Sequence, residues 1–190
     1  MIKVYIKKIQ DFDINETENI KNTLSAETRE RLNKKRNKAL LLASLCALSL
    51  LTDKQRSNLS YTESGRPHFE TLDEDISISH SPTHVAIAIS NSQNTPVGID
   101  IEANYTKNIS TTRFLTENEQ LLLKNGTPYV EIWTKKEALF KYLKNDSTPF
   151  IHLNSATPEQ YNASFTTLQI ENSTLTICAP SNEEIEIIQK

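Results

Sequence analysis

Apolar and polar residues alternate along several short stretches of the chain, which is the pattern expected of half-buried β-strands. The stretches that read as strands are residues 1–9, 58–62, 75–79, 83–90, 97–102, 150–154, 164–170, 175–178 and 185–188. Two longer stretches have the 3.6-residue period of helices instead. One runs from an N-cap at Ser25 to about Leu51, and the other opens at Pro128 and ends near Asn145. A shorter helix begins at Thr116, where Glu119 completes a capping box.

The order of these elements repeats once along the chain. A strand, a long helix and three strands are followed by a strand, helices and three or four more strands. This order predicts an α+β protein of two similar lobes related by a pseudo-twofold axis, residues 1–93 and 94–190. In each lobe we expect a mostly antiparallel sheet to pack on one long helix, with the functional site at the interface between the lobes.

Composition excludes several classes of partner. The 190 residues carry a formal net charge of −3, which argues against general nucleic-acid binding. The longest apolar stretch, residues 39–51, is shorter than the ~20 residues that a membrane span requires. The charged start of the chain is unlike a secretion signal, and the two cysteines form no disulfide framework, so we expect a cytoplasmic protein. Three glycines in the whole chain rule out a glycine-rich nucleotide loop.

Two carboxylates share one face of the strand at residues 97–102. Asp100 and Glu102 are two residues apart, so both side chains point to the same side. Paired carboxylates repel each other unless they are solvated, ion-paired or bound to a cation, and Mg²⁺ prefers such oxygen ligands. A solvated edge strand explains the same pattern.

Charged and aromatic residues share one stripe of the helix at 128–145. The stripe consists of Trp133, Lys136, Glu137, Phe140 and Lys141. Glu137 and Lys141 are spaced as an ordinary surface ion pair, but the neighbouring aromatic residues place them at the margin of a core. With Asp100 and Glu102, this stripe offers three carboxylates and two ammonium groups for a divalent cation and a phosphorylated ligand.

Further candidates for anion binding lie in the first half of the chain. Arg66 stands in a Gly-Arg-Pro turn, His80 lies between two serines after a strand, and Lys38 or Arg36 adjoins the apolar half of the first long helix. Each is also explained without a ligand, as an incidental turn residue, a locally hydrogen-bonded histidine and a solvated basic face.

Four of these segments together resemble the 4′-phosphopantetheinyl transferase superfamily, in particular its two-lobed, Sfp-like branch. The segments are Ser64-Gly65-Arg66-Pro67, Ile78-Ser79-His80-Ser81, Val97-Gly98-Ile99-Asp100-Ile101-Glu102 and Trp133 through Lys141, with Phe114-Leu115-Thr116 and Glu119 between the last two. The resemblance covers roughly residues 30–145. It implies transfer of the phosphopantetheine arm of coenzyme A to a serine hydroxyl of an apo acyl or peptidyl carrier protein. Adenosine 3′,5′-bisphosphate would be released, and Mg²⁺ would be required.

The resemblance also implies a role for each matching residue. Asp100, Glu102 and Glu137 would bind the metal, and Lys136 and Lys141 would contact the pyrophosphate. Lys38, Arg66, Ser79 and His80 would hold the nucleotide, with Arg36 as the alternative to Lys38. Glu137 would be the general base, and Lys141 would neutralise or protonate the leaving phosphate. Arg66 replaces the lysine that is usual in its turn, which keeps the charge but changes the geometry.

Two rival functions are open at this point. One is a relative that binds coenzyme A or a carrier protein without turnover, and the other is a Mg²⁺-dependent phosphodiesterase with water as the nucleophile. For the transferase we expect a monomer that binds its carrier protein transiently.

Overall fold

The computed structural model of the chain describes residues 1–104, 113–144 and 148–190. The strands are β1 Ile2–Lys8, β2 Leu59–Tyr61, β3 Pro67–Phe69, β4 Asp75–His80, β5 His84–Ser90, β6 Gly98–Ala103, β7 Ser164–Ile170, β8 Ser173–Ala179 and β9 Ile185–Gln189. The helices are α1 Thr17–Thr23, α2 Ala26–Asn33, α3 Lys38–Ser49, α4 Asp53–Asn58, α5 Glu117–Lys124 and α6 Tyr129–Leu143. Short 3₁₀ turns cover Ile9–Asp11, Ile14–Glu16, Phe150–His152 and Pro158–Tyr161.

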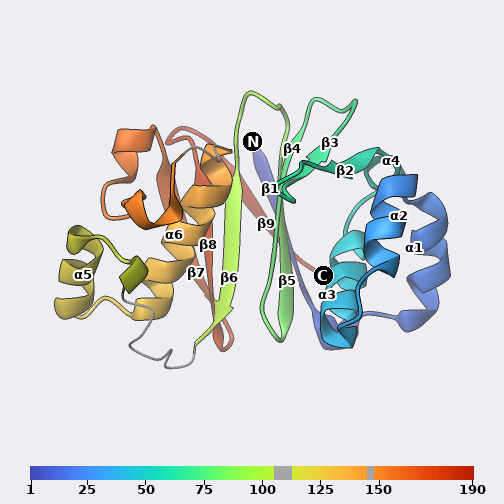
Figure 1. Ribbon diagram of the computed structural model, residues 1–190, viewed down its shortest axis with the longest axis horizontal. Coiled ribbons are helices and arrows are strands. Elements are labelled where there is room, and N and C mark those ends of the chain that lie inside the picture. The colour runs from blue at the N-terminus through green and yellow to red at the C-terminus, as the bar shows by residue number, and fades with distance from the viewer. Residues whose placement is uncertain (105–112, 145–147) are drawn as a thin grey trace.

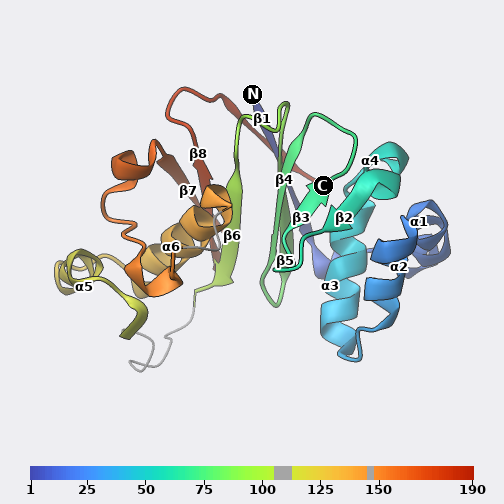
Figure 2. The ribbon, with the colours of Figure 1, turned by 45° about the horizontal axis from the view of Figure 1, so that its top comes forward.

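The elements stack in four layers, from helices through two sheets to helices (Figure 1). The first sheet has the strand order β4-β5-β1-β9, and α1 to α4 cover its outer face. The second has the order β6-β8-β7, with α6 across its outer face. All pairings are antiparallel except that of β9 with β1, which is parallel. A small β2-β3 hairpin lies beside the first sheet (Figure 2). The mixed α+β class is therefore confirmed.

Alternation along the strands builds a core on each side of the first sheet. Ile2, Val4 and Ile6 of β1 face the second sheet and pack with Ile99 and Ile101 of β6. The opposite face of β5 packs against the helices through residues such as Val85, Ile87 and Ile89. A third cluster joins α6 to β8, because Ala138, Leu139 and Tyr142 belong to the same buried cluster as Cys178. The central strands are thus fixed from both sides.

The predicted long helix at 25–51 is wrong, since it is two helices. α2 ends at Asn33, and α3 starts at Lys38 after a break that the period did not reveal. Asn37 explains the restart, because its side chain accepts hydrogen bonds from the N–H groups of Ala39 and Leu40 as an N-cap. The basic run just before this cap adds like charges that do not favour a continuous helix.

Other boundaries also differ from the sequence prediction. The predicted strand at 150–154 begins as the 3₁₀ turn Phe150–His152, and α1 and α4 occupy stretches that were not assigned to helices. The predicted helix end near Asn145 lies outside the described residues, and α6 itself ends at Leu143.

The strands of the two sheets come from different parts of the chain, with one exception, and the division into lobes 1–93 and 94–190 stays a prediction. β1, β4 and β5 come from residues 1–93, and β6, β7 and β8 come from 94–190. β9 also comes from the second half but pairs with β1, so the halves are tied together by a shared sheet. A pseudo-twofold relation between two lobes stays a prediction.

In the parts of the chain that the structure describes, no helix is long and apolar enough to cross a bilayer.

Candidate functional site

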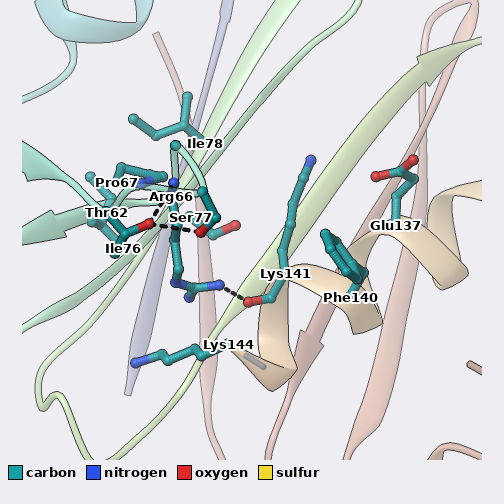
Figure 3. Close-up of a pocket in the computed structure, with 12 residues that line it drawn as sticks. Thr62, Arg66, Pro67, Ile76, Ser77, Ile78, Glu137, Phe140, Lys141 and Lys144 are labelled. Carbon is teal, nitrogen blue, oxygen red and sulfur yellow. Dashed lines mark hydrogen bonds between the residues drawn. The ribbon is translucent and has the colours of Figure 1, made fainter. Parts of the chain in front are cut away.

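A cavity of about 320 Å³ opens between the turn that contains Arg66, strand β4 and helix α6 (Figure 3). The charged side chains that line it are Arg66, Glu137, Lys141 and Lys144. The turn is closed by hydrogen bonds to Thr62, and Gly65 takes the left-handed φ of +86° that it requires. The lining thus has three cations and one carboxylate, and this excess of positive charge at the wall of the cavity favours an anionic ligand.

The floor of this region is a seam where the edge strands β4 and β6 meet. The backbone of β6 does not pair with the backbone of β4; N–H groups of β6 and of Val97 just before it donate to side chains of β4 instead. The bonds are Val97 N–H to Asp75 Oδ2 at 2.9 Å, Ile99 N–H to Ser77 Oγ at 3.0 Å, and Ile101 N–H to Ser79 Oγ at 3.4 Å. Asp75, Ser77 and Ser79 lie on one face of β4, so alternate residues make the ladder. The seam therefore fixes β6, and with it Asp100, relative to the first sheet.

Lys141 reaches into the seam from the last turn of α6. Its ammonium lies 2.8 Å from Asp100 Oδ1, 2.9 Å from the carbonyl oxygen of Ile99 and 3.2 Å from Ser79 Oγ. The Ser79 hydroxyl also donates to Asp100 Oδ1 at 2.8 Å. The structure thus brings together three residues that the sequence singled out, Ser79, Asp100 and Lys141.

Close packing of α6 on β6 makes this reach possible. A Cβ at Gly98 would lie 1.9 Å from the carbonyl oxygen of Ala138 and 2.6 Å from the amide nitrogen of Tyr142. The glycine thus lets the helix backbone approach the strand more closely than any side chain would allow.

Lys144 is the third cation that lines the cavity, and Asp75 pairs with it from outside the lining; the sequence analysis missed both. Lys144 Nζ lies 2.8 Å from Asp75 Oδ1, and Arg66 Nη2 lies 3.5 Å from Asp75 Oδ2. Arg66 also donates to the carbonyl oxygen of Lys141 (Figure 3). The signal for Asp75 was its place two residues before Ser77, on the same face as Ser77 and Ser79.

The three predicted metal ligands are not gathered into one cluster. Within residues 1–104, 113–144 and 148–190, no three histidine, cysteine, aspartate or glutamate side chains lie close enough to hold one ion. Glu137 lines the cavity described above, whereas Glu102 lines a second hollow of about 500 Å³ beside the start of α3. The shared metal site stays a prediction.

Asp100 nonetheless has the chemistry of a cation ligand. Its carboxylate is 5% exposed, and Oδ2 has no hydrogen-bond partner within the described part of the chain. A buried anionic oxygen without a partner costs free energy, which a bound hard cation would offset. Asp100 therefore fits a Mg²⁺ site chemically.

Lys136 is not brought to the cavity, contrary to the predicted pyrophosphate contact. Its side chain is fully buried, 2.8 Å from Glu119 Oε2, and it donates to the carbonyl oxygen of Leu153. Glu119 also accepts hydrogen bonds from the backbone of Thr116 and Ser155 and from the Ser155 hydroxyl. Adjacent helix residues point about 100° apart, so Lys136 faces α5 while Glu137 faces the cavity.

Burial and pairing shift both pKa values of this ion pair. Burial raises the pKa of Glu119, but the hydrogen bonds from Lys136, Ser155 and Thr116 outweigh it and hold the pKa below its ordinary value. Burial lowers the pKa of Lys136, and Glu119 opposes this shift. Lys136 is therefore a structural residue that joins α6 to α5 and to the segment around Leu153.

His80 and Lys38 lie apart from the first cavity. His80 is exposed at the end of β4 and borders a hollow of about 130 Å³ together with Arg31 and Lys35. The Arg31 guanidinium stacks on the ring of Tyr61, 4.3 Å from its centroid. The pKa of Lys35 is lowered, mainly by burial and also by the nearby charge of Arg31. Lys38 is exposed at the first residue of α3. Arg31 and Lys35, rather than Lys38, thus provide the described positive charge beside His80.

Comparison with known proteins gives a family match for part of the chain. No curated protein matches it. Residues 96–185, just under half of the chain, match the family model of the 4′-phosphopantetheinyl transferase superfamily. The matched segment contains Asp100, Glu102, Glu137 and Lys141, and it supports a role in phosphopantetheine transfer in general.

Proposed function

We propose that the protein transfers the 4′-phosphopantetheine arm of coenzyme A to a serine hydroxyl of an apo acyl or peptidyl carrier protein, as enzymes of the Sfp-like branch do. The observation that carries the proposal is the contact of Lys141 with Asp100 and Ser79 at a cation-lined cavity. The family match covers two of these residues, and Ser79 comes from a segment before the match, so the proposed site combines both halves of the chain.

Charge balance around the cavity favours a divalent cation as a cofactor. Arg66, Lys141 and Lys144 face the three carboxylates of Asp75, Asp100 and Glu137, so their formal charges cancel. A pyrophosphate would add uncompensated negative charge to a partly buried region, which is unfavourable. We propose that Asp100, Glu102 and Glu137 hold Mg²⁺, which when bound would neutralise charge on the pyrophosphate and polarise the phosphorus.

Each residue around the cavity would then have a role set by its position. Arg66 and Lys141 would bind phosphate oxygens, while Ser79 and His80, with Arg31 and Lys35 nearby, would hold the nucleotide end. Glu137 would take the proton of the carrier serine hydroxyl as its oxygen attacks the phosphorus that carries the pantetheine arm. The bond from that phosphorus to the bridging pyrophosphate oxygen would break, and adenosine 3′,5′-bisphosphate would leave with the electron pair. Catalysis would thus rest mostly on positioning and electrostatics.

The test is mass spectrometry of candidate apo carrier proteins incubated with this protein, coenzyme A and Mg²⁺. Wild-type protein should add the phosphopantetheine mass to a carrier, and Asp100→Asn or Glu137→Gln should reduce the rate by at least about 10²-fold. Glu131→Gln is a matched control, because Glu131 lies on the same helix but pairs with Lys135. It should keep the wild-type rate.

Other outcomes would point to the rival functions. Coenzyme A binding by calorimetry without mass gain on any carrier would indicate a binding protein. Release of adenosine 3′,5′-bisphosphate with water as the acceptor would indicate a phosphodiesterase. Transfer at the wild-type rate by both Asp100→Asn and Glu137→Gln would show that the proposed site is wrong.

A further inference from the structure

Lys144 holds a backbone conformation that its residue type disfavours. It ends α6 with φ +51° and ψ +22°, in the left-handed region where glycine is the usual residue. Among the described residues, the other non-glycine residues with positive φ are Asn162 and Glu171. Asparagine tolerates this region through its short polar side chain, but lysine has no such local compensation. The side chain of Lys144 must therefore contribute something that glycine would not.

Its contact is with a buried acid on a different layer of the fold. Lys144 Nζ lies 2.8 Å from Asp75 Oδ1, so the end of α6 is tied to the start of β4. The Asp75 side chain is 5% exposed, and its other oxygen accepts from the Val97 N–H at 2.9 Å and lies 3.5 Å from Arg66 Nη2. One buried carboxylate thus meets the Arg66 turn, strand β6 and helix α6 at a single point.

The two cations that pair with Asp75 can reach a ligand in the cavity, whereas Asp75 itself is not part of the cavity lining. Arg66 and Lys144 both line the cavity, and the Lys144 side chain is 32% exposed. Figure 3 shows the Arg66 guanidinium beside the carbonyl group of Lys141, with the Lys144 side chain below it in this view. An anion that enters the cavity therefore meets the cations, while the acid that aligns them stays beneath.

We propose that Lys144 is a further substrate-binding cation for the phosphate groups of coenzyme A, and that Asp75 is the positioning residue that aligns Lys144 and Arg66. This inference rests on the proposed function, because it concerns the ligand of the same cavity. A purely structural tie is the competing explanation, and the two differ in which kinetic constant a substitution changes.

Lys144→Gly separates the two explanations. The variant removes the ammonium but relieves the left-handed backbone, and Asp75 keeps the Val97 N–H and Arg66 as partners, so urea unfolding should give a stability close to that of wild type. Loss of one charge-assisted phosphate contact should raise the KM for coenzyme A about tenfold and change kcat by no more than about twofold. Lys135→Ala is the matched control, since Lys135 is an ion-paired lysine of the same helix that does not line the cavity. It should leave KM unchanged.

Asp75→Asn tests the positioning role. Asparagine keeps the volume and an oxygen for the Val97 N–H but loses the charge that holds Lys144 and Arg66. We expect a KM several-fold above wild type, and a smaller additional effect of Asp75→Asn once Lys144→Gly is present, because both changes act on the same contact. If Asp75 only repelled the ligand, the loss of its negative charge would make the cavity bind an anion more tightly. A lowered KM in Asp75→Asn would therefore show that Asp75 competes with the ligand and would overturn its positioning role.

The failures of the two proposals are distinguishable. Transfer by wild type together with an unchanged KM in Lys144→Gly would overturn this inference alone, and a loss of stability in that variant would identify Lys144 as a structural tie. Absence of both binding and transfer of coenzyme A by wild type would overturn the proposed function and this inference together.

Discussion

Glu119→Gln is expected to be among the most destabilising conservative substitutions in this chain, although Glu119 lies outside the cavity. Glu119 and Lys136 are both fully buried and 2.8 Å apart, and water cannot solvate the charge that is left when one partner becomes neutral. Breaking a buried ion pair on one side costs about 3–5 kcal/mol. Globular domains have a total stability of only about 5–15 kcal/mol, so the loss would be a large fraction of the whole.

The exposed ion pair between Glu131 and Lys135 of α6 is the reference against which the cost of Glu119→Gln can be measured. Glu131 and Lys135 form a pair at 2.6 Å, but their side chains are 28% and 24% exposed, so Glu131→Gln should cost less than about 1 kcal/mol. Urea unfolding of the two variants under the same conditions gives both free energies. The double substitution Glu119→Gln with Lys136→Met removes the stranded ammonium, and it should recover at least about 1 kcal/mol relative to Glu119→Gln.

Two results would refute this reasoning. The first is a cost of Glu119→Gln no greater than that of Glu131→Gln, which would mean that water or a rearrangement solvates Lys136. The second is a double variant less stable than Glu119→Gln alone, which would mean that the contact of Lys136 with Leu153 outweighs its unpaired charge.

Two further predictions concern packing and pH. Gly98→Ala would drive a Cβ into the α6 backbone. We expect a destabilisation of about 3 kcal/mol or more in urea unfolding and a transfer rate reduced about 10²-fold. Near-wild-type values of both would contradict the close packing. Because the folded-state pKa of Glu119 lies below its unfolded value, its stabilisation is fully present above the ordinary glutamate pKa and is lost as pH falls through the lowered value. Unfolding free energies measured from neutral to acid pH should therefore fall less steeply in Glu119→Gln than in wild type, and parallel curves would contradict this linkage.

The sequence was sufficient to predict the elements that form the site. Alternation identified the strands that became β4, β5 and β6, because the side chains of a half-buried strand alternate between two environments. The sequence singled out Ser79, Asp100 and Lys141 as separate site candidates, and the structure brings these three into contact. The predicted meeting of Asp100, Glu102 and Glu137 around one ion stays a prediction. Periodicity carries information about which face of an element is buried, and these residues lie at the margins of buried faces.

The sequence was insufficient where tertiary contacts decide the outcome. Lys136 was placed on the ligand-binding stripe by its helical spacing and by the family motif, and neither reveals that its partner is Glu119, 17 residues away on another helix. Lys144 and Asp75 were missed because their significance is their contact with each other, and no local pattern marks a pair that is so far apart in sequence. The break between α2 and α3 depends on one capping side chain, Asn37, inside a polar stretch that fits a helix equally well.

The parallel pairing of β1 with β9 has a consequence for how the protein is made. Residues 2–6 are synthesised before residues 185–189, the strand that covers one of their edges. Until then β1 exposes a row of unpaired backbone groups, which favours association with other nascent chains. Closure of this sheet is a contact of very long sequence separation, and it is expected to be a late and slow event in folding. The cavity is built on β4 at the opposite edge of the same sheet, so the sheet that supports it would be completed last.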